Sequence, residues 1–305
     1  MNDNDFQGPD DPQRKRMLLT TYALLATFGV MLFYAFGTNL FQVLAADYVT
    51  RGEDIEISPR NFMLALASAQ VFFLLIPTIR LAARHRLGLG TVLRFRSPPR
   101  HFLLYTAALA VCAFILSAVW MTLQELYLVP DFLRGIYNSW AESNELFTEH
   151  LLVGEDIPLL LLGLLAVGFV PAICEELFFR GLIQRSFEGE LAPRTAIWIT
   201  ALLFAVIHMQ PVLLIPLTGL GLLLGYLAWR SGSILPAILL HLLFNTIQFL
   251  AANLVLGEGE GQAVPGNPDL GGGLAGLLLI GGTTLIVLTL ILRRIERDTV
   301  PISGA

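Results

Sequence analysis

The sequence predicts an all-helical protein that forms a bundle of membrane-crossing helices. Hydrophobic residues make up 55% of the 305 positions and charged residues only 14%, whereas soluble domains carry about 25% charged residues. The apolar stretches lack the alternation of a barrel strand, and most are long enough for the roughly 20 residues of a membrane helix. The net charge of −5 excludes the basic surface on which nucleic-acid binding depends. We therefore expect the lipid bilayer, and no nucleic acid, as a partner.

Eight apolar stretches are candidate membrane helices, and seven is the rival count because the fifth stretch is short. The fifth and sixth are joined only by Gln210 and Pro211. Because proline ends one helix and suits the first turn of the next, we expect two separate helices there. The predicted spans are residues 17–44, 62–82, 102–126, 157–184, 195–209, 212–229, 233–254 and 272–292.

The basic residues predict how these spans are oriented. If the N-terminus is cytoplasmic, 16 of the 19 Lys and Arg residues lie on the cytoplasmic side, as the positive-inside rule requires. Only Arg51, Arg60 and Arg134 then lie outside. Seven spans would place the basic C-terminal segment outside, so the charges favour eight spans with both termini in the cytoplasm.

Polar flanking segments divide the chain into four parts. Residues 1–16 are acidic and proline-containing and predict a disordered cytoplasmic tail. Residues 17–156 hold the N-terminal membrane helices and an outer loop, 127–156, whose spaced apolar residues predict an interfacial amphipathic helix. Residues 157–250 form the membrane core that carries the polar motifs below. Residues 251–305 hold an outer loop, the last membrane helix and a cytoplasmic tail.

The first candidate site residues are two adjacent carboxylates in an apolar helix, where an ionisable group costs at least a few kcal/mol. Glu176 lies four residues before Arg180, so these two side chains share a helix face and can pair. Glu175 projects about 100° away and lacks this partner. Such a carboxylate is suited to act as a general base.

Two later helices carry the remaining polar candidates. His208 follows Phe204 by four residues and Asn245 follows His241 by four, so each pair shares a face. Counted from the basic residue at the inner end of each helix, a rise of about 1.5 Å per residue places Glu175 about 15 Å, His241 about 17 Å and His208 about 21 Å deep. The three side chains are therefore expected to meet.

This convergence depends on where the fourth helix leaves the membrane. If the boundary is Arg185, the helix is long and tilted and the depths agree; if it is Arg180, Glu175 lies much shallower. Gly221 and Gly225 in the sixth span have small-xxx-small spacing, which permits close helix approach. We expect this span to hold the fifth and seventh helices near each other.

The three motifs resemble, in order and spacing, those of the CAAX prenyl protease and bacteriocin-processing (CPBP, or Abi) family of intramembrane proteases. The resemblance covers about residues 157–250 and implies an all-helical membrane fold whose polar cavity opens to the cytoplasm. It also implies peptide hydrolysis without an acyl-enzyme. In the roles that it implies, Glu175 and His208 activate a water, His241 and Asn245 stabilise the oxyanion, and Glu176, Arg180 and Phe204 support the site.

The family is commonly described as metalloproteases, so the resemblance also bears on cofactor and substrate. Glu175, His208 and His241 could form an open zinc site, but the spacing does not decide between zinc and a directly activated water. The implied substrate is a prenylated CAAX-type peptide or another membrane-associated peptide or protein. The short chain without targeting features indicates a prokaryotic plasma membrane, with the site facing the cytoplasm.

Other interpretations of the same residues remain open. The two carboxylates could extend to the cytoplasmic interface, and His208, or His241 with Asn245, could serve helix packing. The chain would then be a non-catalytic membrane immunity or scaffold protein that binds peptide or metal in the same cavity, or a proton-relaying transporter. The His-Glu-x-x-His, Gly-x-Ser-Gly and Gly-x-Gly-Asp patterns of other intramembrane proteases are absent from the sequence.

Overall fold

The computed structural model describes residues 29, 58–83, 93–98, 100–149, 151, 156–256 and 273–298. Within these residues the chain is helical and contains no strand, so the predicted all-helical class is confirmed. Six of the described helices are long and apolar enough to cross a membrane, and α10 (Pro193–Ile207) is a shorter apolar helix. Apart from Gly29, the predicted span 17–44 lies outside the described residues, so the total of eight spans and the location of the termini stay predictions.

The first three long helices change between α- and π-winding along their length. The helix at 59–82 comprises α2 (Pro59–Ala69), η2 (Gln70–Leu75) and α3 (Ile76–Ala82). The next comprises α5 (Arg100–Leu123) and η3 (Gln124–Leu128). The third comprises α7 (Ile157–Gly163), η4 (Leu164–Phe169), α8 (Val170–Glu176), η5 (Leu177–Ile183) and α9 (Gln184–Glu188).

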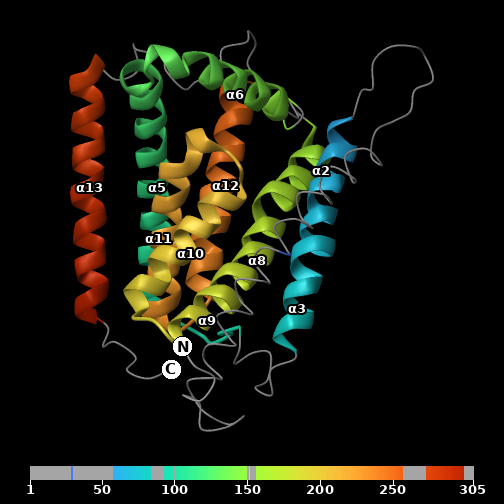
Figure 1. Ribbon diagram of the computed structural model, residues 1–305, viewed down its shortest axis with the longest axis vertical. Coiled ribbons are helices and arrows are strands. Elements are labelled where there is room, and N and C mark those ends of the chain that lie inside the picture. The colour runs from blue at the N-terminus through green and yellow to red at the C-terminus, as the bar shows by residue number, and fades with distance from the viewer. Residues whose placement is uncertain are drawn as a thin grey trace, which may run out of the picture.

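The remaining elements are α6 (Asp131–Glu149), η6 (Pro211–Leu213), α11 (Leu214–Ser231), α12 (Leu235–Leu256) and α13 (Gly273–Asp298). Helix α6 lies in the predicted outer loop and runs across one end of the bundle, while α13 stands at its edge beside α5 (Figure 1). The helix expected in that loop is therefore present.

Prolines account for two of the π-helical segments. Pro77 follows η2 and Pro171 follows η4, each in the first turn of the next α-helix. Because proline has no N–H and its ring crowds the carbonyl four residues earlier, a local widening of the helix relieves the conflict. Such π-segments frequently occur at functional sites.

The close approach of α10 and α11 depends on glycine. A Cβ added at Gly221 would lie 3.0 Å from the Cα of Ala201, and one at Gly225 would lie 3.0 Å from a side-chain carbon of Ile197. These pairs run in opposite directions along the two helices, which therefore pack antiparallel. Helix α11 also packs against α12, so it lies between the fifth and seventh predicted spans, as expected.

The long helix that starts at Ile157 continues past Arg180 to Glu188. The side chain of Arg180 is fully buried within the protein, so the helix and its packing both extend beyond this residue. Further along, Glu188 pairs with Arg94, whose backbone carbonyl accepts a bond of 3.1 Å from the Ile234 amide. The length of this helix agrees with the deeper of the two expected positions for Glu175, and the depth in the membrane stays a prediction.

Candidate active site

Glu175 lies at the centre of a polar cluster to which α8, α10 and α12 contribute. Its Oε2 atom is 4.0 Å from His208 Nε2 and 3.9 Å from His241 Nε2. These separations are too long for direct hydrogen bonds and suit one water bonded between the groups. Oε2 is buried, and no group among the described residues hydrogen-bonds to it. The convergence expected from the depths is therefore present.

The other oxygen of Glu175 accepts a hydrogen bond from outside the predicted motifs. Gln70 Nε2 donates to Glu175 Oε1 at 2.8 Å. Gln70 is 5% exposed and begins the π-segment η2, which packs against α8. Sequence reasoning missed this residue, because the search followed ionisable side chains and an amide is not one. A single glutamine within an apolar span was the available signal.

Glu176 occupies a different environment from its neighbour. Its Oε1 accepts a hydrogen bond of 2.9 Å from Arg180 Nη1 and another of 2.9 Å from His241 Nδ1. Glu176 and Arg180 are both fully buried. Arg180 also donates to the backbone carbonyl of Gly221 at 3.2 Å. The pair expected from the four-residue spacing is present, and it also fixes one ring nitrogen of His241.

Backbone and aromatic contacts orient His208. Its Nδ1 lies 2.7 Å from the carbonyl oxygen of Phe204, and because a carbonyl only accepts, Nδ1 carries the proton of this bond. In the neutral ring, Nε2 then presents a lone pair toward Glu175. The Phe204 ring packs edge to face against both imidazoles, with centroids 4.8 Å from His208 and 5.8 Å from His241.

The Phe204 ring also contacts the buried cation. Arg180 Cζ lies 4.6 Å from the ring centroid, within the range of a cation–π interaction. Phe204 is fully buried. It therefore packs against both histidines and the ion pair at once, in the position of a supporting residue.

Asn245 is placed by the proline-induced distortion of the long helix. Its Nδ2 donates to the carbonyl oxygen of Val167 at 3.0 Å. In a regular α-helix this carbonyl would accept a hydrogen bond from the N–H of the residue four positions later. That residue is Pro171, which has no N–H. An amide nitrogen carries two hydrogens, so the bond to Val167 fixes the amide and leaves a second N–H. The structure gives no bond between Asn245 and the other candidate residues.

Exposure differs sharply among the three central side chains. The side chain of His208 is 28% exposed, that of Glu175 11% and that of His241 4%. His208 is therefore the most exposed member of the cluster and His241 the most buried.

The donor atoms of Glu175, His208 and His241 are of the types that zinc accepts. Two ligands about 2.1 Å from one tetrahedral ion would lie about 3.4 Å apart, and the measured separations of 3.9 and 4.0 Å are longer. Within the described residues, no group of three or more His, Cys, Asp and Glu side chains is arranged to hold a metal ion. We therefore derive no step through a metal.

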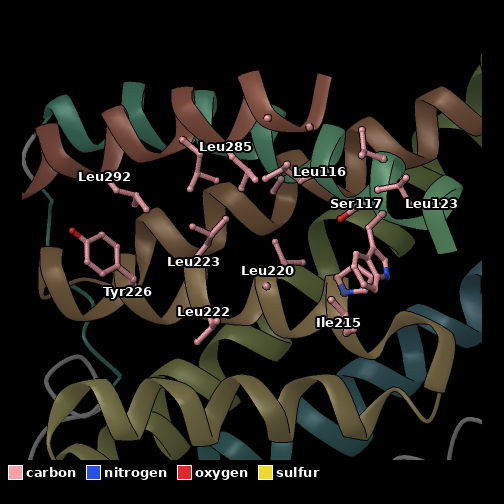
Figure 2. Close-up of a pocket in the computed structure, with 18 of the residues that line it drawn as sticks. Leu116, Ser117, Leu123, Ile215, Leu220, Leu222, Leu223, Tyr226, Leu285 and Leu292 are labelled. Carbon is pink, nitrogen blue, oxygen red and sulfur yellow. The ribbon is translucent and has the colours of Figure 1, made fainter. Parts of the chain in front are cut away.

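A cavity of about 760 Å³ lies elsewhere, between α5, α11 and α13. Figure 2 shows Leu285 and Leu292 of α13 facing Leu220 and Leu223 of α11 across it. Its lining is almost entirely apolar and includes none of the candidate catalytic residues. This cavity is thus separate from the Glu175 cluster.

Comparison with known proteins relates part of the chain to a family. No curated protein and no solved structure matches the chain. Residues 157–247 match the family model described as type II CAAX prenyl endopeptidase, Rce1-like. The match runs from the start of α7 to the part of α12 that carries both His241 and Asn245. The predicted family resemblance is confirmed over this segment, which is similar to the Rce1-like type II CAAX prenyl endopeptidases.

Proposed function

We propose that the chain is an intramembrane endopeptidase in which Glu175 and His208 activate a water that attacks a peptide carbonyl. The observation that carries this proposal is the unpaired, buried Oε2 of Glu175, about equally distant from the Nε2 atoms of two histidines. The family match supports protease activity of the CAAX type, and the membrane helices support an integral membrane location.

The proposed reaction needs no covalent enzyme intermediate. A water held between Glu175 and His208 donates its hydrogens to Oε2 and to Nε2. As its oxygen bonds to the carbonyl carbon, Glu175 takes one proton. The tetrahedral intermediate then collapses, the C–N bond breaks, and Glu175 passes this proton to the departing amine. Water is consumed and two peptide fragments leave.

The negative charge on the former carbonyl oxygen needs donors that are already in place. Asn245 can supply its second N–H. His241 donates from Nδ1 to Glu176, so it can donate from Nε2 only when the ring carries both protons. The carboxylate of Glu176 balances the charge of that imidazolium. His241 and Asn245 are therefore the proposed oxyanion-stabilising pair.

The proposed substrate is a prenylated CAAX-type peptide or another membrane-associated peptide, since the active groups lie within membrane helices. We place the protein in a prokaryotic plasma membrane with the site open to the cytoplasm. Zinc held by Glu175, His208 and His241 stays a prediction that a chelator tests.

The experiment uses the purified full-length chain in proteoliposomes with a farnesylated CAAX peptide and the same peptide without the lipid. Mass spectrometry identifies the products. We expect E175Q and H208A each to lower the cleavage rate by about 10²–10⁴-fold, the usual contribution of acid–base catalysis. The matched controls are E190Q and H101A, whose side chains lie outside the cluster, and they should cleave at the wild-type rate.

Cleavage that survives in both E175Q and H208A would contradict the proposal and favour a scaffold or immunity role. Preference for the farnesylated peptide would support the CAAX assignment, and equal rates would favour a broader class of peptides. Unchanged cleavage after treatment with a chelator would remove the zinc prediction. Loss of cleavage with the chelator and recovery with added zinc would establish it.

A further inference from the structure

Gln70 is the only described side chain that donates a hydrogen bond to the Glu175 carboxylate. The bond of 2.8 Å joins Gln70 Nε2 to Oε1 and leaves Oε2 as the oxygen that faces both imidazoles. A carboxylate rotates about its last bond with only a broad two-fold preference. A bond at one oxygen therefore determines where the other one points.

The scaffold around Gln70 is built to hold this bond. Gln70 is 5% exposed, and the η2 segment that it begins packs against α8. Gln70 itself has α-helical backbone angles, φ −58° and ψ −45°, and lies where α2 passes into η2. Both ends of the bond thus lie on packed helices, which position a side chain more accurately than loops do.

The chemical character of the donor matters as much as its place. An arginine or lysine here would bind Glu175 in an ion pair, as Arg180 does for Glu176. A neutral amide stabilises the carboxylate through one hydrogen bond and leaves its charge available to attract a proton from water. The partner of a general base in this position is expected to be neutral.

We propose that Gln70 is a positioning residue, which orients Glu175 so that Oε2 holds the attacking water between the two histidines. This inference rests on the proposed function. It extends the active machinery to α2–η2–α3, a helix outside the matched residues 157–247.

The test uses Q70M, which keeps the size of the side chain and removes the donor. We expect kcat to fall about 10- to 100-fold, the usual effect of losing a residue that orients a catalytic ligand, while KM stays near the wild-type value. Q124M is the matched control: Gln124 is a glutamine in a membrane helix that accepts a bond from Trp120. It should leave both constants unchanged. Q70A is the second variant if Q70M does not fold.

A second readout does not depend on cleavage. The infrared difference spectrum between wild type and E175Q isolates the carboxylate bands of Glu175, and the loss of a hydrogen bond shifts them. We expect the shift in Q70M and not in Q124M. Unshifted bands, or a wild-type kcat in Q70M, would overturn the role of Gln70. If the wild type itself cleaved no peptide, the proposed function would fail, and the infrared bands would still decide whether the Gln70–Glu175 bond exists.

Discussion

The substitution E176Q tests whether the buried ion pair supports the structure around the site. Both hydrogen bonds to Glu176 end on Oε1, so a glutamine oxygen can accept them, and the main change is the loss of the negative charge. Arg180 is then left fully buried without the carboxylate that it pairs with, and Glu175 is the more distant negative charge that still acts on it. For charges about 4 Å apart, an effective dielectric constant of 20 gives about 4 kcal/mol, which agrees with the 3–5 kcal/mol typical of breaking a buried pair.

The assay is equilibrium unfolding in mixed detergent micelles. We expect E176Q to lower the free energy of unfolding by about 3–5 kcal/mol, and E142Q, on exposed α6, to change it by less than about 0.5 kcal/mol. The double variant E176Q/R180M removes both charges and should recover at least half of the loss, because replacing a whole buried pair is often neutral. A double variant no more stable than E176Q, or a loss below about 1 kcal/mol in E176Q, would refute the reasoning.

Two further substitutions test the helix contacts and the oxyanion donors. G221V places a branched side chain where even a Cβ would lie 3.0 Å from the Ala201 backbone, and we expect the free energy of unfolding to fall by about 1–3 kcal/mol in the same assay. The matched control is G219V, because a Cβ at Gly219 would meet nothing within 4 Å. Equal losses in the two variants would rule out the contact with Ala201 as the cause. N245A removes the proposed amide donor and should lower kcat about 10²- to 10³-fold with little change in KM. A kcat unchanged in N245A, measured with the farnesylated peptide, would exclude Asn245 from the oxyanion site.

The sequence was sufficient to predict the membrane helices and the meeting of three polar motifs. A rise of about 1.5 Å per residue converts a count of residues from the basic inner boundary into an approximate depth. Although η5 is π-wound between Arg185 and Glu175, Glu175, His208 and His241 meet as the approximate depths predict. The spacing of four residues likewise predicts the Glu176–Arg180 pair, since such residues share a helix face. Both predictions use only local geometry.

Contacts between helices were beyond the same reasoning. The bond of His241 to Glu176 depends on how two helices are rotated about their axes, which residue depth does not determine. The sequence shows that Pro171 leaves the Val167 carbonyl without its usual helical N–H donor. It does not show that Asn245 supplies the bond instead, because that depends on how α12 packs against this helix. Gln70 was missed because the search followed ionisable side chains, and its contact with Glu175 is one between separate helices.

The two adjacent glutamates have different hydrogen-bond partners and therefore suit different roles, one structural and one chemical. Glu176 is fully buried and bonded to Arg180 and His241, so the loss of its charge would leave a buried cation alone. Glu175 has a neutral amide on one oxygen, and its second oxygen is buried, faces both imidazoles and has no hydrogen-bond partner among the described residues. A general base must gain a proton and return it in every cycle, and only Glu175 can do so without breaking an ion pair. Among the described residues the hydrogen-bond donor to Glu175 comes from η2, so under the proposed function the matched segment 157–247 would hold the reactive groups but would not orient the base by itself.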